Sequence, residues 1–149
     1  MILLAKEIHK KRTTFLDEFI PVFQKHYDSI GSENEQVHLV YKSQLNDAPM
    51  EKLLVEYERK DVFTRYSNAG IHKDDLIFEI KGHPVKKFGS QGQQKSFLIA
   101  LRLAQYEWLK EHLRVLPILL LDDIFDKLDH TRVERLMKLV ANNYFGQGW

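Results

Sequence analysis

Apolar residues recur every three or four positions along residues 2–30, and this spacing predicts an amphipathic helix. The positions are Leu4, Ile8, Phe15, Phe19, Val22, Phe23, Tyr27 and Ile30. Pro21 lies within this pattern and lacks the backbone N–H of a helix interior, so a kink or break is expected there. His9 to Arg12 form a basic run on the same stretch, for which a solvated helix face is a better explanation than contact with DNA phosphates.

In the middle of the chain the spacing of apolar residues changes to a period of two. Residues 37–41 alternate apolar with polar side chains, as a half-buried strand does, and further along Leu76, Phe78 and Ile80 alternate with Ile77, Glu79 and Lys81. Residues 50–66 between these two stretches favour a helix. Gly82-His83-Pro84 then turns the chain toward residues 85–88, which predicts a hairpin whose second strand is 85–88.

The second half predicts helix, strand and helix in that order. A helix is expected from about Gln91 to Leu113, with an apolar stripe at Phe97, Leu101, Ala104 and Trp108. Pro117 prevents its continuation, and the apolar run 118–121 is typical of a parallel strand that is buried on both faces. Asp129 or Thr131 is expected to cap a last helix, whose apolar positions are Val133, Leu136, Met137 and Val140.

Composition narrows the class of protein. The chain has 149 residues, a net charge of +1 and no cysteine, so disulfides and zinc–thiolate sites are excluded. No apolar run approaches the roughly 20 residues of a membrane span. We therefore expect a protein of the cytoplasm.

The stretch from Phe88 to Lys95, FGSQGQQK, has the character of a phosphate-binding loop. Gly89, Ser90, Gln91 and Gly92 lead directly into a helix, whose N-terminus favours anions. Ser90 offers a hydroxyl, and Gly92 allows the backbone to approach a ligand closely. Many helices begin with serine and glycine for capping alone, and this explanation stays open for the loop by itself.

Paired carboxylates follow the apolar run of the predicted strand. Ligands gather at the carboxyl ends of strands in open parallel sheets, where Asp122 and Asp123 are expected to lie. Neighbouring side chains on a strand point to opposite faces, so one carboxylate can hold Mg²⁺ while the other faces a water molecule. A turn cap is the alternative for these two acids. His72, Asp74 and Asp75 also invite a metal site, but a surface cluster explains them better, and their role stays open.

The order of these motifs resembles an ABC-type ATPase head. FGSQGQQK resembles the signature motif, PILLLDD the Walker B strand and DKLD the D-loop. Within that superfamily the stretch is similar to the RecF family of bacterial recombination-repair ATPases, which carry an aspartate, as Asp123 here, where most ABC proteins have glutamate. GIHKDDL resembles a further RecF segment, with Ile71 in place of a proline. The implied fold is the C-terminal part of an α/β ATPase head with parallel strands, plus a helical or α+β second lobe. Residues 1–68 would be the mainly helical segment of the second lobe, and residues 69–149 the signature and Walker B part of the head.

The resemblance implies a composite site for ATP and Mg²⁺. The signature residues would contact the γ-phosphate of a nucleotide bound by the other subunit of a homodimer, and they are Ser90, Gln91, Gly92 and Gln93. Asp122 would hold Mg²⁺, and Asp123 would be the catalytic residue that polarises water. Asp129 would be the D-loop residue at the interface, beside Arg132.

The resemblance also implies a biological role. RecF-type proteins act in DNA repair, recombination and replication and in the SOS response, on gapped DNA or junctions of duplex and single-stranded DNA, with RecO and RecR as partners. No GxxxxGK[ST] occurs in the chain, so we expect it to be a fragment that does not hydrolyse ATP by itself.

Three alternatives are weaker. A non-catalytic dimerisation or DNA-contact module would leave the DD pair and the GQQK loop unexplained. The head of an SMC-type protein would favour glutamate at position 123 and sustained heptads in residues 1–30. A receiver-type phosphoacceptor pocket would have no use for the GQQK loop.

Overall fold

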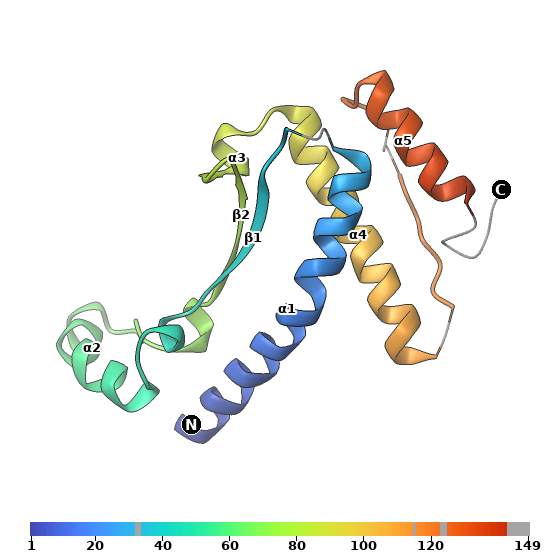
Figure 1. Ribbon diagram of the computed structural model, residues 1–149. Helices are drawn as coiled ribbons and strands as arrows, with labels where there is room; N and C mark the ends of the chain where they lie inside the picture. Colours follow the sequence, from blue (N-terminus) through green and yellow to red (C-terminus); the bar gives the residue numbers. More distant parts are fainter. Residues whose placement is uncertain (32–33, 115, 123–124, 143–149) are drawn as a thin grey trace. The chain divides into compact units, whose positions relative to one another are not determined.

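The computed structural model describes residues 1–31, 34–114, 116–122 and 125–142. In chain order the elements are α1 (Ile2–Ile30), β1 (Val37–Lys42), η1 (Gln44–Asn46), α2 (Met50–Thr64), η2 (Ile71–Lys73), β2 (Asp75–Ile80), β3 (His83–Pro84), α3 (Val85–Phe88), α4 (Gln91–Leu113) and α5 (His130–Ala141) (Figure 1). No helix in these ranges is both long and apolar enough to cross a membrane.

The chain forms two compact units that are interleaved in sequence. One comprises Met1–Asp17 and Leu39–Ile77, and the other comprises Glu18–His38 and Phe78–Trp149. Residues 18–38 therefore belong with the second half of the chain, so the units do not follow the expected division between residues 68 and 69. The reason is that α1, β1 and β2 each contribute residues to both units.

Helix α1 is one continuous helix of 29 residues with Pro21 inside it, so of the expected kink or break, the break is wrong. Proline removes one helical hydrogen bond and strains the preceding turn. Phe19 and Phe23, on either side of it, are both buried. Burial of aromatic side chains before and after Pro21 favours the helical path through it, because each contributes roughly 1.5–3 kcal/mol.

In the first unit, Asp74 is a buried anchor rather than a surface carboxylate. It accepts hydrogen bonds from Arg12, at 2.6 Å, and from Tyr41, at 2.5 Å. Burial alone would raise the pKa of Asp74, but the bonds from Tyr41, Ser43 and Arg12 hold it below its usual value. Arg12 keeps a 44% exposed side chain, as expected for a solvated face, while it pairs with Asp74, whose side chain is 5% exposed and has a structural role.

The hairpin is confirmed, but its second strand is much shorter than expected. Strand β2 pairs antiparallel with β3, with Ile80 opposite His83. Lys81 and Gly82 form the two-residue connection and both have positive φ, of 50° and 76°, as a type I′ turn requires. Residues 85–88, expected as strand, form the single helical turn α3, which begins after Pro84 and closes with a bond from Gly89 N–H to the Val85 carbonyl.

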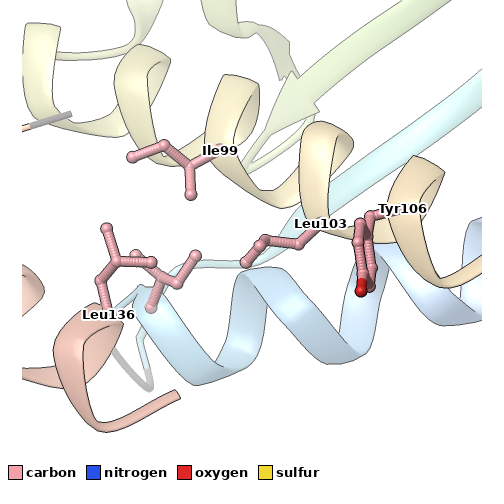
Figure 2. Close-up of a cluster of buried hydrophobic side chains, with 5 residues drawn as sticks. Ile99, Leu103, Tyr106 and Leu136 are labelled. Atoms are coloured by element: carbon pink, nitrogen blue, oxygen red, sulfur yellow. The ribbon is translucent and has the colours of Figure 1, made fainter. Parts of the chain in front are cut away.

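The core of the second unit is a cluster of side chains from three helices, α1, α4 and α5 (Figure 2). Its buried members are Ile30, Ile99, Leu103, Tyr106 and Leu136. Leu119 and Leu121 pack against it, whereas Ile118 and Leu120 are 78% and 82% exposed.

The expectation that residues 118–121 are buried on both faces is therefore wrong. The described three-stranded sheet, in the order β1-β2-β3, does not include this segment. A strand is buried on both faces only where neighbouring elements cover each side. The described part of the chain supplies a core on one side of the segment.

Candidate nucleotide-contact site

The FGSQGQQK stretch forms the start of α4, and its local structure follows from a capping box. Ser90 is the N-cap residue, and its hydroxyl oxygen accepts a hydrogen bond from the Gln93 backbone N–H at 3.2 Å. The Gln93 side-chain oxygen in turn accepts from the Ser90 backbone N–H at 2.8 Å. Two N–H groups that the helix cannot satisfy are thus paired. Helix α4 runs from Gln91 to Leu113, as predicted.

The capping box leaves donors available at the tip of the helix. Ser90 and Gln91 are exposed, and Gly92 is half-buried. The hydroxyl of Ser90 accepts in the cap, but its O–H remains a donor. The backbone N–H groups of Gln91 and Gly92 have no acceptor within the helix because they belong to its first turn. Together with the helix dipole, these donors suit an anion such as a phosphate.

Gly92 lies against the segment that precedes α5. A Cβ atom added at Gly92 would be 3.3 Å from the backbone carbonyl oxygen of Lys127. That distance is tight for a methyl group, so glycine permits the close approach here. The signature loop therefore contacts the predicted D-loop within the same chain.

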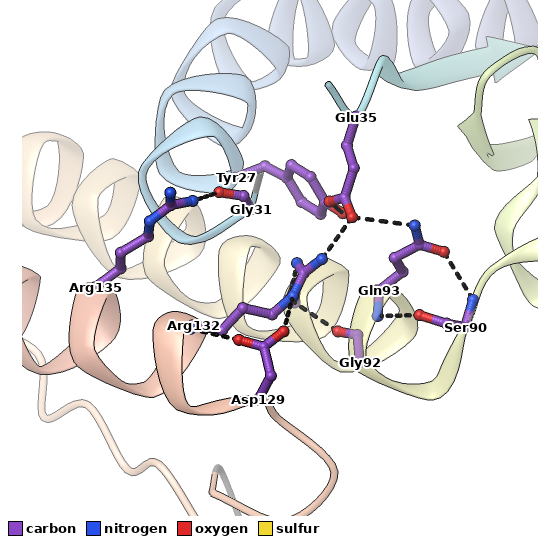
Figure 3. A network of polar contacts seen from close by, with 10 residues as sticks. Tyr27, Gly31, Glu35, Ser90, Gly92, Gln93, Asp129, Arg132 and Arg135 are labelled. Carbon is purple, nitrogen blue, oxygen red and sulfur yellow. Dashed lines mark hydrogen bonds and ion pairs between the residues drawn. The ribbon is translucent and has the colours of Figure 1, made fainter. Parts of the chain in front are cut away.

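The carboxylate of Glu35 faces Gln93 of the signature loop, and the Glu35 side chain is only 8% exposed (Figure 3). Three donors from three helices converge on it. One oxygen accepts from Gln93 Nε2, at 3.0 Å, and from Arg132 Nη2, at 2.5 Å. The other accepts from the Tyr27 hydroxyl at 2.7 Å. Glu35 thus joins α1, α4 and α5.

Arg132 is the second member of this network and is also largely buried, at 10% exposed. Its guanidinium donates to Glu35, to the Ser96 hydroxyl at 2.9 Å and to the Asp129 carboxylate at 3.2 Å. Ser96 itself donates to the Gly92 carbonyl at 2.8 Å. Arg132 therefore contacts both the α4 and the α5 side of the site. Nearby, Arg135 donates to the Gly31 carbonyl and fixes α5 to the end of α1.

The ionisation states follow from these contacts. Burial alone would raise the pKa of Glu35, but hydrogen bonds from Arg132, Tyr27 and Gln93 lower it below its ordinary value. Burial, followed by the bond to Glu35, raises the pKa of Tyr27. Burial opposes the charge on Arg132, yet Glu35 raises the pKa of that guanidinium. The network is therefore an ionised pair with a neutral tyrosine at neutral pH.

Asp129 caps α5, as predicted. Its carboxylate accepts from the Arg132 backbone N–H at 2.8 Å, and it remains largely exposed. The cap and the ion pair with the Arg132 side chain use the two oxygens of one carboxylate. The predicted D-loop residue thus presents its side chain at the surface while it orients Arg132.

Of the two predicted acids after the apolar run, only Asp122 is among the described residues. Asp122 is exposed. Asp123, the predicted catalytic residue, lies outside the described residues. Within the described ranges no group of three or more His, Cys, Asp or Glu side chains is arranged to hold a metal ion. Asp122 is an exposed carboxylate, and a carboxylate holds Mg²⁺ when phosphate and water complete the shell of the ion.

Glu35 is the residue of this site that the sequence did not reveal. It lies in a short polar stretch between a helix and a strand, where glutamate is ordinary turn material. Its partners are 58 and 97 residues further along the chain. Only the packing of α1 against α4 and α5 brings them together.

This chain is similar to bacterial proteins named RecF. The chain is 56% identical over 143 residues to the DNA replication and repair protein RecF of Flavobacterium johnsoniae, which covers 96% of this chain and 40% of that protein. It is 48% identical over 140 residues to the protein of the same name from Bacteroides thetaiotaomicron, with 94% of this chain and 38% of that protein covered. No family model matches the chain.

Solved structures support the same relationship. One, described as the recombination mediator protein RecF-ATP in the RecFOR pathway, matches with a TM-score of 0.71 and 25% identity over 93% of this chain and 40% of that chain. A second, described as RecF-ATPrS, has the same TM-score and identity over 90% and 38%. The expected resemblance to the RecF family and the α/β ATPase fold class are confirmed. The chain spans about two-fifths of the length of the relatives that it matches.

Proposed function

We propose that this chain, a RecF-type sequence by its similarity to one part of those proteins, is the signature and Walker B part of an ATPase that dimerises when it binds ATP. The activity belongs to the longer protein, of which this chain supplies one portion. In that protein the loop at Ser90 contacts the γ-phosphate of a nucleotide bound by the partner subunit. The acids after the apolar run serve a nucleotide bound by the same subunit.

The proposal rests on one observation, which is that Ser90 caps α4 and still leaves hydrogen-bond donors available at the start of that helix. Its oxygen holds the start of α4, while its O–H and the first backbone N–H groups of the helix stay available at the surface. Behind the loop, Gln93 is held by the buried carboxylate of Glu35. A loop fixed from behind with exposed donors suits a phosphate that arrives from another molecule.

The residues also fit Mg²⁺ in part. Asp122 is exposed and carries the charge that a magnesium ion requires, and magnesium in nucleotide sites is held by one or two carboxylates together with the phosphates. When bound, the ion would neutralise phosphate charge. We assign Asp122 to hold it and Asp123 to orient the attacking water, as the resemblance implies.

We extend the proposal to the biological setting from the names of the relatives and from what the family resemblance implies. The longer protein would act in DNA repair, recombination and replication in the cytoplasm. It would bind gapped DNA or duplex–single-strand junctions and work with RecO and RecR. A non-catalytic dimerisation or DNA-contact module is the second candidate, favoured only by the lack of a GxxxxGK[ST] sequence in these 149 residues.

The decisive experiment measures ATP-dependent dimerisation of the full-length protein with Ser90→Arg. The variant places a large cation where the phosphate would sit, and loss of dimerisation with retained ATP binding by the monomer is expected. Ser67→Arg is a matched control, because Ser67 is also exposed and belongs to the other compact unit. Unchanged dimerisation of Ser90→Arg would contradict the proposal.

A second measurement separates the two candidate functions. Asp123→Asn in the full-length protein is expected to abolish ATP turnover while dimerisation persists, since the amide cannot accept a proton from water. Unchanged turnover would remove the catalytic assignment. The present chain alone is expected to show no ATPase activity, because it has no P-loop lysine or phosphate-binding amides.

A further inference from the structure

We infer that Glu35 is a positioning residue, which holds the signature loop in its phosphate-binding form and ties it to the D-loop of the same subunit. The inference rests on the proposed function of the loop. It assigns a role to a residue outside the signature, Walker B and D-loop motifs.

The first step of the argument is the position of Gln93. Its side-chain amide donates to Glu35 and accepts from the Ser90 backbone N–H. Each end of one amide group thus has a fixed partner, so the Gln93 side chain cannot rotate without breaking the capping box. Because the amide nitrogen has two hydrogens, one remains for a phosphate oxygen while the other binds Glu35.

The second step concerns charge. A buried carboxylate directly behind an anion site would repel a phosphate if it were uncompensated. Arg132 donates to the same Glu35 oxygen that accepts from Gln93. The positive guanidinium therefore neutralises the charge at this point, and Glu35 can orient Gln93 without weakening the site for an anion.

The third step is the connection to the D-loop. Arg132 binds the Asp129 carboxylate through its side chain and its backbone, and Asp129 ends the D-loop. Glu35 therefore connects two parts of the site (Figure 3). Gln93 joins it to Ser90, and Arg132 joins it to Asp129. The donor from Tyr27 occupies the other carboxylate oxygen and fixes the plane of the group.

The test uses the full-length protein and Glu35→Gln, which keeps the shape and one acceptor but removes the charge. The affinity of ATP-dependent dimerisation is expected to fall by about tenfold, which corresponds to a free-energy change of about 1.4 kcal/mol. ATP binding by the monomer is expected to stay unchanged, since the loop serves the partner's nucleotide. Glu134→Gln, which removes an exposed carboxylate of α5, is the matched control with no expected effect.

A double-mutant cycle distinguishes positioning from general stability. If Glu35 acts through Gln93, Glu35→Gln adds nothing to the dimerisation defect of Gln93→Ala. Additive defects, or equal loss of monomer ATP binding, would overturn the inference. If Glu35→Gln does not fold, Glu35→Asp keeps the charge opposite Arg132 while it shortens the reach to Gln93, and it is expected to weaken dimerisation in the same way.

The outcomes also separate this inference from the proposed function. Loss of dimerisation in Ser90→Arg with normal dimerisation in the Glu35 variants would leave the function standing and refute the role of Glu35. Normal dimerisation in Ser90→Arg would refute the proposed function itself.

Discussion

Glu35 and Arg132 are 97 residues apart in the sequence, and their side chains form a largely buried ion pair at 2.5 Å. The pair lies where the end of α1, the start of α4 and the start of α5 meet. Its position gives it two separable consequences, one for the stability of this part of the fold and one for the shape of the loop at Ser90.

Removal of the cation should destabilise the fold strongly. Arg132→Met keeps much of the side-chain volume but leaves Glu35 buried without its counter-ion, and loss of one partner of a buried pair costs on the order of 3 kcal/mol. Urea unfolding of the chain measures this loss of stability. Lys138→Met, which breaks an exposed pair with Glu134 on the same helix, is the control and should leave the urea midpoint nearly unchanged. Equal midpoints for the two variants would contradict a structural role for the buried pair.

Acid should weaken the fold through Glu35. Its pKa is lower in the folded chain than the ordinary value of 4.5, so the unfolded chain binds the proton more readily. The resulting stabilisation is fully present above pH 4.5 and is lost as the pH falls through the folded-state pKa. Urea unfolding between pH 6 and pH 3 should show a shallower loss of stability in Glu35→Gln. Parallel curves for the variant and the original chain would show that the ion pair does not depress this pKa.

His26 should act in a separate, higher pH window. Burial lowers its pKa below the ordinary value of 6.5, although the bond to Glu107, at 2.6 Å, opposes this effect and Lys25 adds to it. Stability is therefore full above pH 6.5 and falls at lower pH, because the unfolded chain then binds a proton on His26 that the folded chain does not yet bind. His26→Gln should remove the slope that begins below pH 6.5, and NMR titration of the imidazole would measure the pKa directly. A folded-state pKa above 6.5 would reverse the predicted sign.

Ser90→Asp should separate the structural role of this residue from its proposed phosphate contact. Aspartate is as good an N-cap as serine, and its charge favours a helix N-terminus, so the free energy of unfolding should be retained. The same charge repels a phosphate, so ATP-dependent dimerisation of the full-length protein should be lost. Ser90→Ala, in contrast, removes the cap and should lower the free energy of unfolding by about 1 kcal/mol. Retained dimerisation in Ser90→Asp would show that the loop does not meet an anion.

The elements with strong local signals could be predicted from the sequence. Helix α4 begins and ends where its serine cap and apolar period place it, and Asp129 caps α5 for the same local reason. Residues 85–88 and 118–121 could not be assigned in this way. Short apolar runs suit strand or helix equally, and their burial depends on which elements cover them.

The site was predictable to the extent that it is continuous in sequence. Ser90, Gly92 and Asp129 belong to short motifs whose chemistry is readable locally. Glu35 was not predictable, because its significance depends on Gln93 and Arg132, which tertiary packing alone brings to it. The burial of Asp74 escaped prediction for the same reason, since its partners Arg12 and Tyr41 are distant in sequence.

The close approach of Gly92 to the Lys127 carbonyl has a thermodynamic consequence. The glycine belongs to the loop proposed to serve one nucleotide, and the carbonyl lies on the segment between Asp122 and Asp129, proposed to serve another. If the binding of one nucleotide shifts the contact between Gly92 and the Lys127 carbonyl, the affinities of the two nucleotides are coupled. Reciprocity then requires that each nucleotide alters the affinity of the other by the same factor. In a symmetric dimer, this single contact occurs twice, and such coupling would be observed as cooperativity in ATP binding.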